Sequence, residues 1–598
     1  MKTIYNMDAS RTLKTLKTLA IIALALWLSG CNKWLEEDPQ SNIGPEQVGD
    51  SQEGVDRWVA GVYSNWLYTM FTWDEFPRVL ELDNDYTTGP DWLFGHLGAG
   101  DFSGESALDK MWTGPYNLIN DANMAIRYLK AMSNVDADYR DNAIGECMFQ
   151  KAFCYFLLVR AYGAIPYFDN DVNGGEEFFK PRTPINEVYE KIIGLLEEAE
   201  SKLYSIDNAN YQEGHVSAAS AAALLAKVYA TMASAAMPEG TEITVRTGAP
   251  YTEMTNANGD KVNVCNTPQP VVMHKTAVAG YESFDAAECY TKAAEWAAKV
   301  INGDYGLVSL LNYDELWKKE NRNASEFLFG VHSLSGDGTY RTGLHAYYAG
   351  TYKDSGSDII NEGLFVGNTN NWYQLFDDDD YRIVKGVKHL WQRYYQVEYG
   401  GYFYYPQSWA SKFTGNDFLG NPDTEHPEYP IYPQETSSGI QIVYQYNSGY
   451  ESIAYTNKYD DCEDKSSNNC DSYFPFLRYA DVLLLYAEAL NELGKVGEAA
   501  TALNTVRERS NATLLETVPT QNRMRSLIIE ERAKELALEG DRRWDLIRWG
   551  IYLEAMNAIG GRDDANINKE RTERNLLYPI PTPEINSNPY ITENNPGW

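Results

Sequence analysis

The chain has 598 residues, a formal net charge of −35 and 13% aromatic side chains. A surface this negative repels phosphate backbones, so we expect no nucleic acid as a partner, and a neutral ligand is accepted more easily than an anionic one. The 44 tyrosines and 15 tryptophans combine an apolar face with a polar group, which suits stacking against sugars, although many of these side chains will belong to the core.

The chain begins with a segment typical of export. Basic residues precede LAIIALALWL (Leu19 to Leu28), and ten apolar residues are too few to span a bilayer, which needs about 20. The following Ser29, Gly30 and Cys31 resemble the bacterial lipoprotein signal, which predicts removal of residues 1–30 and lipidation of Cys31. The alternative is an ordinary signal with a chance cysteine.

The acidic run after this cysteine indicates where the protein faces. Glu36, Glu37 and Asp38 resemble the export tag of surface lipoproteins in Bacteroidetes. We therefore expect an outer-membrane protein anchored by lipid and facing the cell exterior, with a periplasmic orientation as the alternative.

Helical periodicity dominates the rest of the chain. In RYADVLLLYAEALNELGK, apolar residues recur at three- and four-residue spacing from Tyr479 to Leu490, and Gly494 ends the helix before a second one begins. Two helices joined by a short turn form a tetratricopeptide-like unit. The same plan predicts further helices over residues 121–132 and 143–163, 184–203 and 216–236, 285–301, and 523–540. About four helix pairs result.

Two long inserts separate these helices. Residues 237–283 include a strand-like VVM, and residues 340–475 are rich in Tyr, Gly and Asp. Ordered long loops in a compact fold are usually functional. We therefore predict one mainly α domain over residues 31–598: an N-terminal helical part (31–236), a part with the inserts and ligand-side loops (237–475), and a C-terminal helical part (476–598).

Two loops contain the best ligand candidates. The first aromatic loop is ELDNDYTTGPDWLFG (Glu81 to Gly95), where Gly89-Pro90 predicts a turn that leaves the face of Trp92 open. The second aromatic loop is GTYRTGLHAYYAGTY (Gly338 to Tyr352). The predicted ligand contacts are Trp92, Asp83, Asn84, Tyr86, Arg341, His345, Tyr347, Tyr348 and Trp372.

Other polar motifs are predicted to be structural. DNDVNGGEEFFK (Asp169 to Lys180) begins like a calcium loop but has Lys180 where a bidentate Glu is required, so a solvated turn is expected. In GDRRWDLIRWG (Gly540 to Gly550), Arg542 or Arg543 is expected to pair with Asp541 or Asp545.

No feature of the chain predicts catalysis. HExxH, GxSxG, GxxxxGK and CxxC motifs are absent and the seven histidines form no short-spaced cluster, so no catalytic, metal or cofactor site is predicted. Cys462 and Cys470 flank a polar loop and could form a disulfide.

Several stretches resemble one known family. PFLRYADVLLLYAEALNELGK, RAKELALEGDRRWDLIRWG, LLYPIPTPEINSNP and CNKWLEEDPQ resemble the RagB/SusD family of surface glycan-binding lipoproteins of Bacteroidetes. CYFLLVRAYGAIPYF and FDDDDYR are similar to further family elements, although Lys151 stands where the family often has Arg.

This resemblance implies a SusD-like fold, in which tetratricopeptide-like helix pairs pack against a loop-rich region with short strands. It also implies a non-enzymatic protein that captures glycan and acts as the lid of a SusC-like TonB-dependent transporter. Family members often place a sugar-stacking tryptophan in the first aromatic loop, and Trp92 matches by position. Some relatives serve peptide import, so a peptide-binding subunit of a related importer is the alternative function.

Overall fold

A computed structural model describes residues 48–71, 75–335, 342–349, 352–353, 360–361, 366–392, 402–431, 453–463, 465 and 470–598. The predicted signal and Cys31 lie outside these residues, as do Arg341 and parts of the second long insert.

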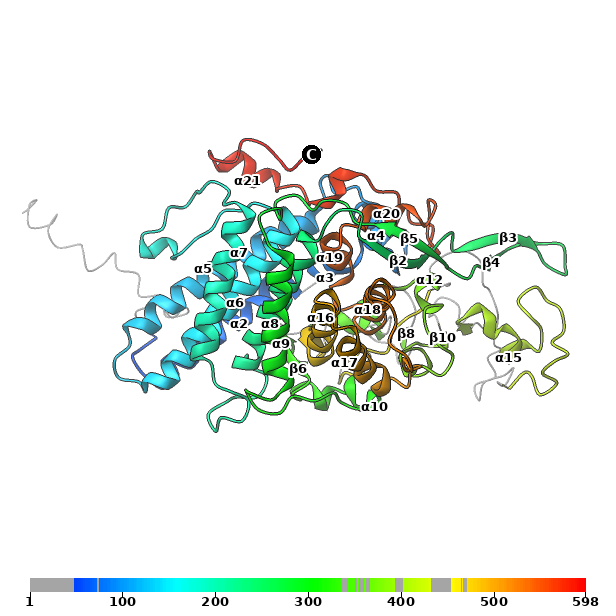
Figure 1. Cartoon of the computed structure of the whole chain (residues 1–598), viewed down its shortest axis with the longest axis horizontal. Coiled ribbons are helices and arrows are strands. Elements are labelled where there is room, and N and C mark those ends of the chain that lie inside the picture. Colours follow the sequence, from blue (N-terminus) through cyan, green and yellow to red (C-terminus); the bar gives the residue numbers. More distant parts are fainter. Residues whose placement is uncertain are drawn as a thin grey trace, which may run out of the picture.

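Long helices form the body of the molecule (Figure 1). They are α2 (Gln52–Asn65), α5 (Ser106–Ala131), α6 (Ala137–Tyr162), α7 (Ile185–Lys202), α8 (Ala218–Ala236), α9 (Ala286–Ile301), α16 (Tyr479–Glu492), α17 (Val496–Arg509) and α18 (Gln521–Glu535). Helices α5 to α9 pack in chain order, and α16 joins α8 and α9 to the C-terminal helices. The predicted mainly α, helix-pair architecture is confirmed.

Helix α8 explains why this packing is close. Its N-terminus is capped by Ser217, which exchanges hydrogen bonds with Ser220, and its small side chains are buried along nearly the whole length. Among the described residues it is the one helix long and apolar enough to cross a membrane, but 94% of its apolar window is buried inside the protein. It is a core helix.

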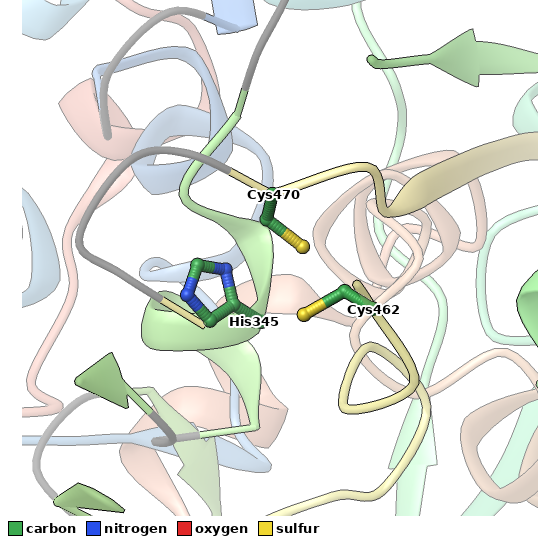
Figure 2. A group of neighbouring side chains, drawn as sticks. All are labelled: His345, Cys462 and Cys470. Atoms are coloured by element: carbon green, nitrogen blue, oxygen red, sulfur yellow. The ribbon is translucent and has the colours of Figure 1, made fainter. Parts of the chain in front are cut away.

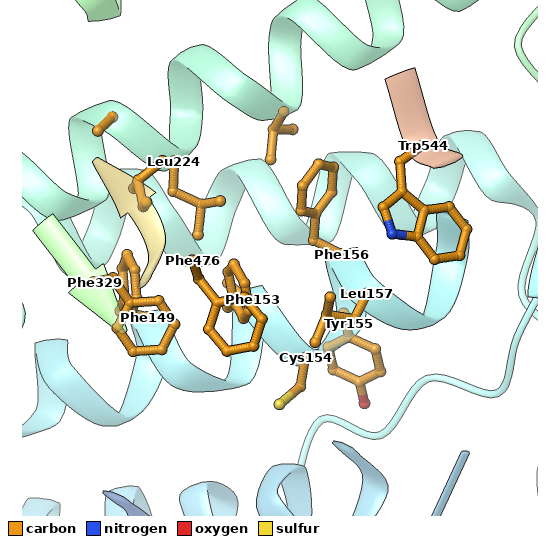
Figure 3. Close-up of a cluster of buried hydrophobic side chains, with 14 of the residues drawn as sticks. Phe149, Phe153, Cys154, Tyr155, Phe156, Leu157, Leu224, Phe329, Phe476 and Trp544 are labelled. Carbon is orange, nitrogen blue, oxygen red and sulfur yellow. The ribbon is translucent and has the colours of Figure 1, made fainter. Parts of the chain in front are cut away.

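The main core surrounds helix α6. Phe149 and Phe153 of α6 pack against Phe329 and Phe476 (Figure 3). The ring centroid of Phe329 lies 5.0 Å from that of Phe149 and 4.9 Å from that of Phe153, and the ring centroid of Phe476 lies 4.9 Å from that of Phe153. Phe329 and Phe476 come from β6 (Phe327–His332) and β12 (Tyr473–Arg478), which pair antiparallel. Residues from both ends of the described chain thus share one core.

Helix α5 is longer than predicted. The periodicity predicts a start at Asp121, whereas the helix begins at Ser106 and contains Pro115. Proline removes one backbone donor. The buried residues on both sides of Pro115, among them Trp112 and Leu118, pack well enough to keep the helix continuous.

The inserts form short strands and turns. The predicted strand VVM lies in β5 (Gln269–His274), which pairs with β2 (Glu242–Thr247), and β3 (Tyr251–Thr255) pairs with β4 (Lys261–Cys265). Figure 1 shows the β3–β4 hairpin extending away from the helical body. This insert is therefore a two-stranded arm.

The remaining elements are short. They are η3 (Trp66–Phe71), α3 (Glu75–Glu81), β1 (Thr87–Thr88), α4 (Asp91–Gly98), η4 (Val172–Gly174), α10 (Tyr313–Leu316), η5 (Lys319–Asn321), α11 (Leu344–Tyr348), β7 (Tyr352–Lys353), β8 (Ile360–Asn361), β9 (Gly367–Asn368), α12 (Asn370–Tyr373), α13 (Tyr381–Val384), β10 (Leu390–Gln392), β11 (Tyr402–Tyr404), η6 (Gln407–Trp409), α15 (Ala410–Thr414), α19 (Arg542–Arg548), α20 (Tyr552–Asn557), η8 (Glu573–Leu576) and α21 (Thr582–Ser587).

A belt of buried ion pairs surrounds α18 and α19. We call this the charged belt; it comprises Asp83, Asp85, Lys227, Glu326, Arg382, Arg478, Asp481, Glu488, Arg507, Arg509, Glu531, Arg532, Glu535, Glu539, Asp541, Arg542, Arg543, Asp545, Arg548 and Arg571. Breaking one buried pair costs about 3–5 kcal/mol, because the other charge is left buried and uncompensated.

The predicted structural role of Gly540 to Gly550 is confirmed, but the pairing is not the predicted one. Arg542 binds Asp85 and Arg543 binds Asp83, residues more than 450 positions away, rather than Asp541 or Asp545. The pattern of α19 alone could not reveal partners so far along the chain.

The loop with calcium-like spacing contains its own counter-ions. Asp171 is buried and accepts a 2.7 Å bond from Arg127, while Glu176 pairs with Lys180 at 2.6 Å. Glu176 also accepts hydrogen bonds from the backbone of Asp169 and Asn170. These carboxylates are satisfied by protein groups, and most of the turn is exposed, as predicted.

Candidate functional site

Trp92 stands out on the first aromatic loop because it is large, apolar and 62% exposed. It lies in the first turn of α4, directly after Pro90 and Asp91. Leu93, Phe94 and Leu97 of the same helix are buried. The helix therefore fixes its apolar side in the core and leaves the indole at the surface, where a flat ligand can stack on it.

A tight turn supports this helix. The Asn84 side chain accepts hydrogen bonds from the backbone of Tyr86 and Thr87 at 2.9 and 2.8 Å. Strand β1 then pairs antiparallel with β9. Tyr86 adds a 2.8 Å hydrogen bond from its hydroxyl to the carbonyl of Arg246. The chain on the N-terminal side of Trp92 is thus held by backbone and side-chain bonds.

Ion pairs of the charged belt hold the same turn in place. Asp83 pairs with Arg543 and with Arg571 and accepts a 2.7 Å hydrogen bond from the Tyr552 hydroxyl. Arg542 binds Asp85 through two nitrogens at 2.8 and 2.7 Å. Burial alone would raise the pKa of Asp83, but the two guanidinium groups hold it below its ordinary value.

Three predicted ligand contacts are therefore corrected. The exposed fractions of Asp83, Asn84 and Tyr86 are 1%, 0% and 4%, so these side chains present no surface to a sugar. Their polar atoms are used by the belt and the turn. They position α4 instead of contacting a ligand.

Two candidates of the second aromatic loop, and Trp372 further along the chain, are also corrected. His345 and Tyr348 of α11 are fully buried, and the Tyr348 hydroxyl donates to the carbonyl of Pro77 at 3.3 Å. Trp372, in α12, is buried and donates to the carbonyl of Ala533 at 2.9 Å. Tyr347 is half-buried against the main core, and Arg341 lies outside the described residues.

One exposed aromatic was not expected. Tyr68, in η3, is 70% exposed and lines a cavity of about 380 Å³ together with Asn65, Asn117, Asn120 and Asp121. Its neighbours Trp66, Leu67, Met70 and Phe71 are buried. The helical spacing of this apolar run could have identified position 68 as the outward one.

A larger cavity, of about 690 Å³, lies away from Trp92. It is lined in part by Tyr63, Glu146, His215 and His332. Glu146 accepts a 2.9 Å hydrogen bond from the Tyr63 hydroxyl, and the same carboxylate oxygen lies 2.8 Å from the Nδ1 atom of His215. Burial and the charge of Arg322 lower the pKa of His332 to about 4. The polar groups of this cavity largely satisfy one another.

Comparisons with known proteins agree with this architecture. The profile of the SusD family matches residues 316–598, and a second profile, described as starch-binding associating with outer membrane, matches residues 33–230. SusD-like protein P2 of Formosa agariphila is 26% identical over 97% of this chain and 99% of its own length.

Solved structures share the fold. The crystal structure of a SusD homolog from Bacteroides thetaiotaomicron has a TM-score of 0.69 at 20% identity and covers 94% of this chain and 100% of its own. Surface glycan-binding protein A of the same species, in complex with laminarihexaose, has a TM-score of 0.62 at 18% identity over 91% of this chain and 99% of its own. With two family profiles matched along its length and this fold, the chain belongs to the SusD family.

Proposed function

We propose that this protein is a cell-surface glycan-binding lipoprotein that delivers oligosaccharide to a SusC-like TonB-dependent transporter in the outer membrane and acts as its lid. It works as a binding protein and not as an enzyme. The observation that carries the proposal is the exposed Trp92 on a base fixed by buried ion pairs. Relatives named as starch-binding and glycan-binding proteins support the ligand class.

The rigid base matters for affinity. Covering roughly 80 Å² of an indole face contributes about 2 kcal/mol at about 25 cal/mol per Å². Millimolar binding requires about 4 kcal/mol net, after the cost of ordering the ligand. One fixed tryptophan with a few hydrogen bonds therefore gives weak capture, which suits a protein that must release its cargo to a transporter.

Calorimetric titration of the wild type and of Trp92→Ala with a panel of neutral oligosaccharides tests this site. We expect one glycan to bind the wild type and to lose about 30-fold in affinity in the variant, the equivalent of about 2 kcal/mol. Tyr590→Ala is the matched control, because Tyr590 is 55% exposed on the C-terminal tail. Unchanged affinity in Trp92→Ala would remove Trp92 from the site.

The same panel separates the two function classes. Binding of peptides in place of glycans would replace the proposed cargo by that of a peptide importer. Aromatic surfaces accept both ligands, so the identity of the cargo depends on this measurement.

The anchor and the partner are tested in cells. We expect Cys31→Ala to leave the outer membrane and to abolish transporter-dependent uptake, since a protein without its lipid has no other anchor in this proposal. Surface labelling of whole cells measures the location of the protein, and an uptake assay with the same cells measures transport. Unaltered location and uptake would contradict the lipid-anchored lid.

A further inference from the structure

Three side chains from distant parts of the chain meet beneath the second aromatic loop. They are His345 of α11, Cys462, and Cys470 just before β12 (Figure 2). Their ligand atoms all lie within 4.8 Å of one another. Figure 2 shows the two sulfurs facing each other, with the imidazole ring beside them.

His345 has an unusual environment for a buried polar residue. Its side chain is completely buried, and among the described residues neither ring nitrogen forms a hydrogen bond to an oxygen or nitrogen atom. Leaving a buried polar group unsatisfied is unfavourable, and native proteins rarely tolerate it without an ion or water. The polar neighbour of the ring is the Cys470 sulfur, which interacts with His345 and also lies 2.6 Å from the Ser472 hydroxyl.

The backbone around the cluster is already fixed. Thr342 and Cys470 form an antiparallel bridge, with N–O distances of 3.2 and 3.0 Å. The backbone N–H of Glu463 donates to Asp471 at 2.8 Å, which holds the segment of Cys462 beside that of Cys470. The three ligands thus come from segments joined independently of any ion.

We propose that His345, Cys462 and Cys470 bind one Zn²⁺ ion. Two thiolates and an imidazole form a ligand set that zinc prefers, and the cluster contains no carboxylate to favour Mg²⁺ or Ca²⁺. Zinc bonds of about 2.3 Å to sulfur and about 2.0 Å to nitrogen place tetrahedral ligand atoms about 3.5–3.8 Å apart. The three ligand atoms therefore need to approach one another by at most about 1 Å.

Binding is balanced in charge and protons. Each thiol releases its proton to solvent, and the two thiolates neutralise the ion, while neutral His345 supplies the third bond. Cys462 is only half-buried, so water can complete the tetrahedral set. Such an ion would connect α11 with the strand pair β6–β12 at the base of the second aromatic loop.

Metal analysis of protein purified anaerobically, without a metal-affinity step, tests the proposal. We expect about one zinc per chain in the wild type and in the control Cys289→Ser, whose cysteine lies in α9. Cys470→Ser and His345→Gln should each contain at least ten-fold less zinc. Adding Zn²⁺ to chelator-treated wild type should raise its melting temperature, so the test does not depend on the variants folding.

Substitution of Cd²⁺ gives a direct view of the ligands. Thiolate–cadmium charge-transfer absorption should develop up to one equivalent in the wild type and be reduced in Cys470→Ser. Two results would each overturn the proposal: reduced wild-type protein that takes up no stoichiometric zinc, or an anaerobic intact mass lower by 2 Da that maps to a Cys462–Cys470 disulfide.

Discussion

Both aromatic loops contain several aromatic side chains, but the structure uses them in opposite ways. In the first, α4 buries Leu93, Phe94 and Leu97 and leaves Trp92 exposed. In the second, α11 is only five residues long, and Leu344, His345, Ala346 and Tyr348 are all buried. A one-sided helix can present an aromatic ring, whereas a short helix covered all round becomes part of the core. The difference in burial leaves Trp92 as the exposed aromatic candidate and makes the second loop part of the core.

The strongest test of this contrast removes the base of the first loop. Asp83→Ala should lower the free energy of unfolding by about 3–5 kcal/mol, because Arg543 and Arg571 lose their shared buried carboxylate. Denaturant unfolding measures the change. Asp91→Ala is the control, since this exposed carboxylate lies on the same loop and should change stability by less than about 1 kcal/mol. Equal changes in the free energy of unfolding for Asp83→Ala and Asp91→Ala would show that the first aromatic loop does not depend on the charged belt.

The second test compares how one substitution in each loop affects stability and glycan affinity. Tyr348→Ala should destabilise the protein by about 3 kcal/mol, because it removes a fully buried ring, yet the folded variant should bind glycan as the wild type does. Trp92→Ala should show the reverse. Unfolding curves and calorimetry on both variants give the four values. A loss of affinity in folded Tyr348→Ala would return the second loop to the ligand site.

The third and smallest effect concerns the buried carboxyl group of Asp564. Asp564 is buried beside Asp563 and accepts a bond from the backbone of Asn370, which starts α12 directly after β9. Burial and the charge of Asp563 raise the pKa of Asp564 to about 7. The folded state therefore favours the neutral acid, and this stabilisation is lost as the pH rises from about 4 to about 7.

Asp564→Asn should consequently stabilise the protein more at pH 8 than at pH 5, by roughly 2 kcal/mol, since two pH units correspond to about 2.7 kcal/mol. Melting curves of both proteins at the two pH values measure this difference. Glu570→Gln, at an exposed neighbour, should show no such pH dependence. A stability difference independent of pH would mean that Asp564 does not titrate in this range.

The helices could be predicted from sequence because their signal is local. The spacing from Tyr479 to Leu490 repeats within one turn of helix, and α16 lies where it was expected, from Tyr479 to Glu492. The exposure of Trp92 agrees with the prediction from the Gly89-Pro90 turn, but the structure places the residue in the short helix α4 and not on a loop.

The remaining features depend on contacts between distant residues. Asp83 resembles a sugar ligand in sequence, and its neutralisation by Arg543 and Arg571 is evident only in three dimensions. His345 and the two cysteines carry no metal-like spacing, since more than one hundred residues separate the histidine from the sulfurs. Sequence reasoning predicted no metal site for this reason.

The ion pairs of Asp83 and Asp85 have a consequence for how the polypeptide matures. They join positions 457 to 488 residues apart, so the turn under Trp92 cannot be secured until nearly the entire chain has been made. Closing so large a loop is entropically unfavourable and slow compared with forming local helices. We therefore expect the local helices to form before this turn, which needs the C-terminal part of the chain for its ion pairs.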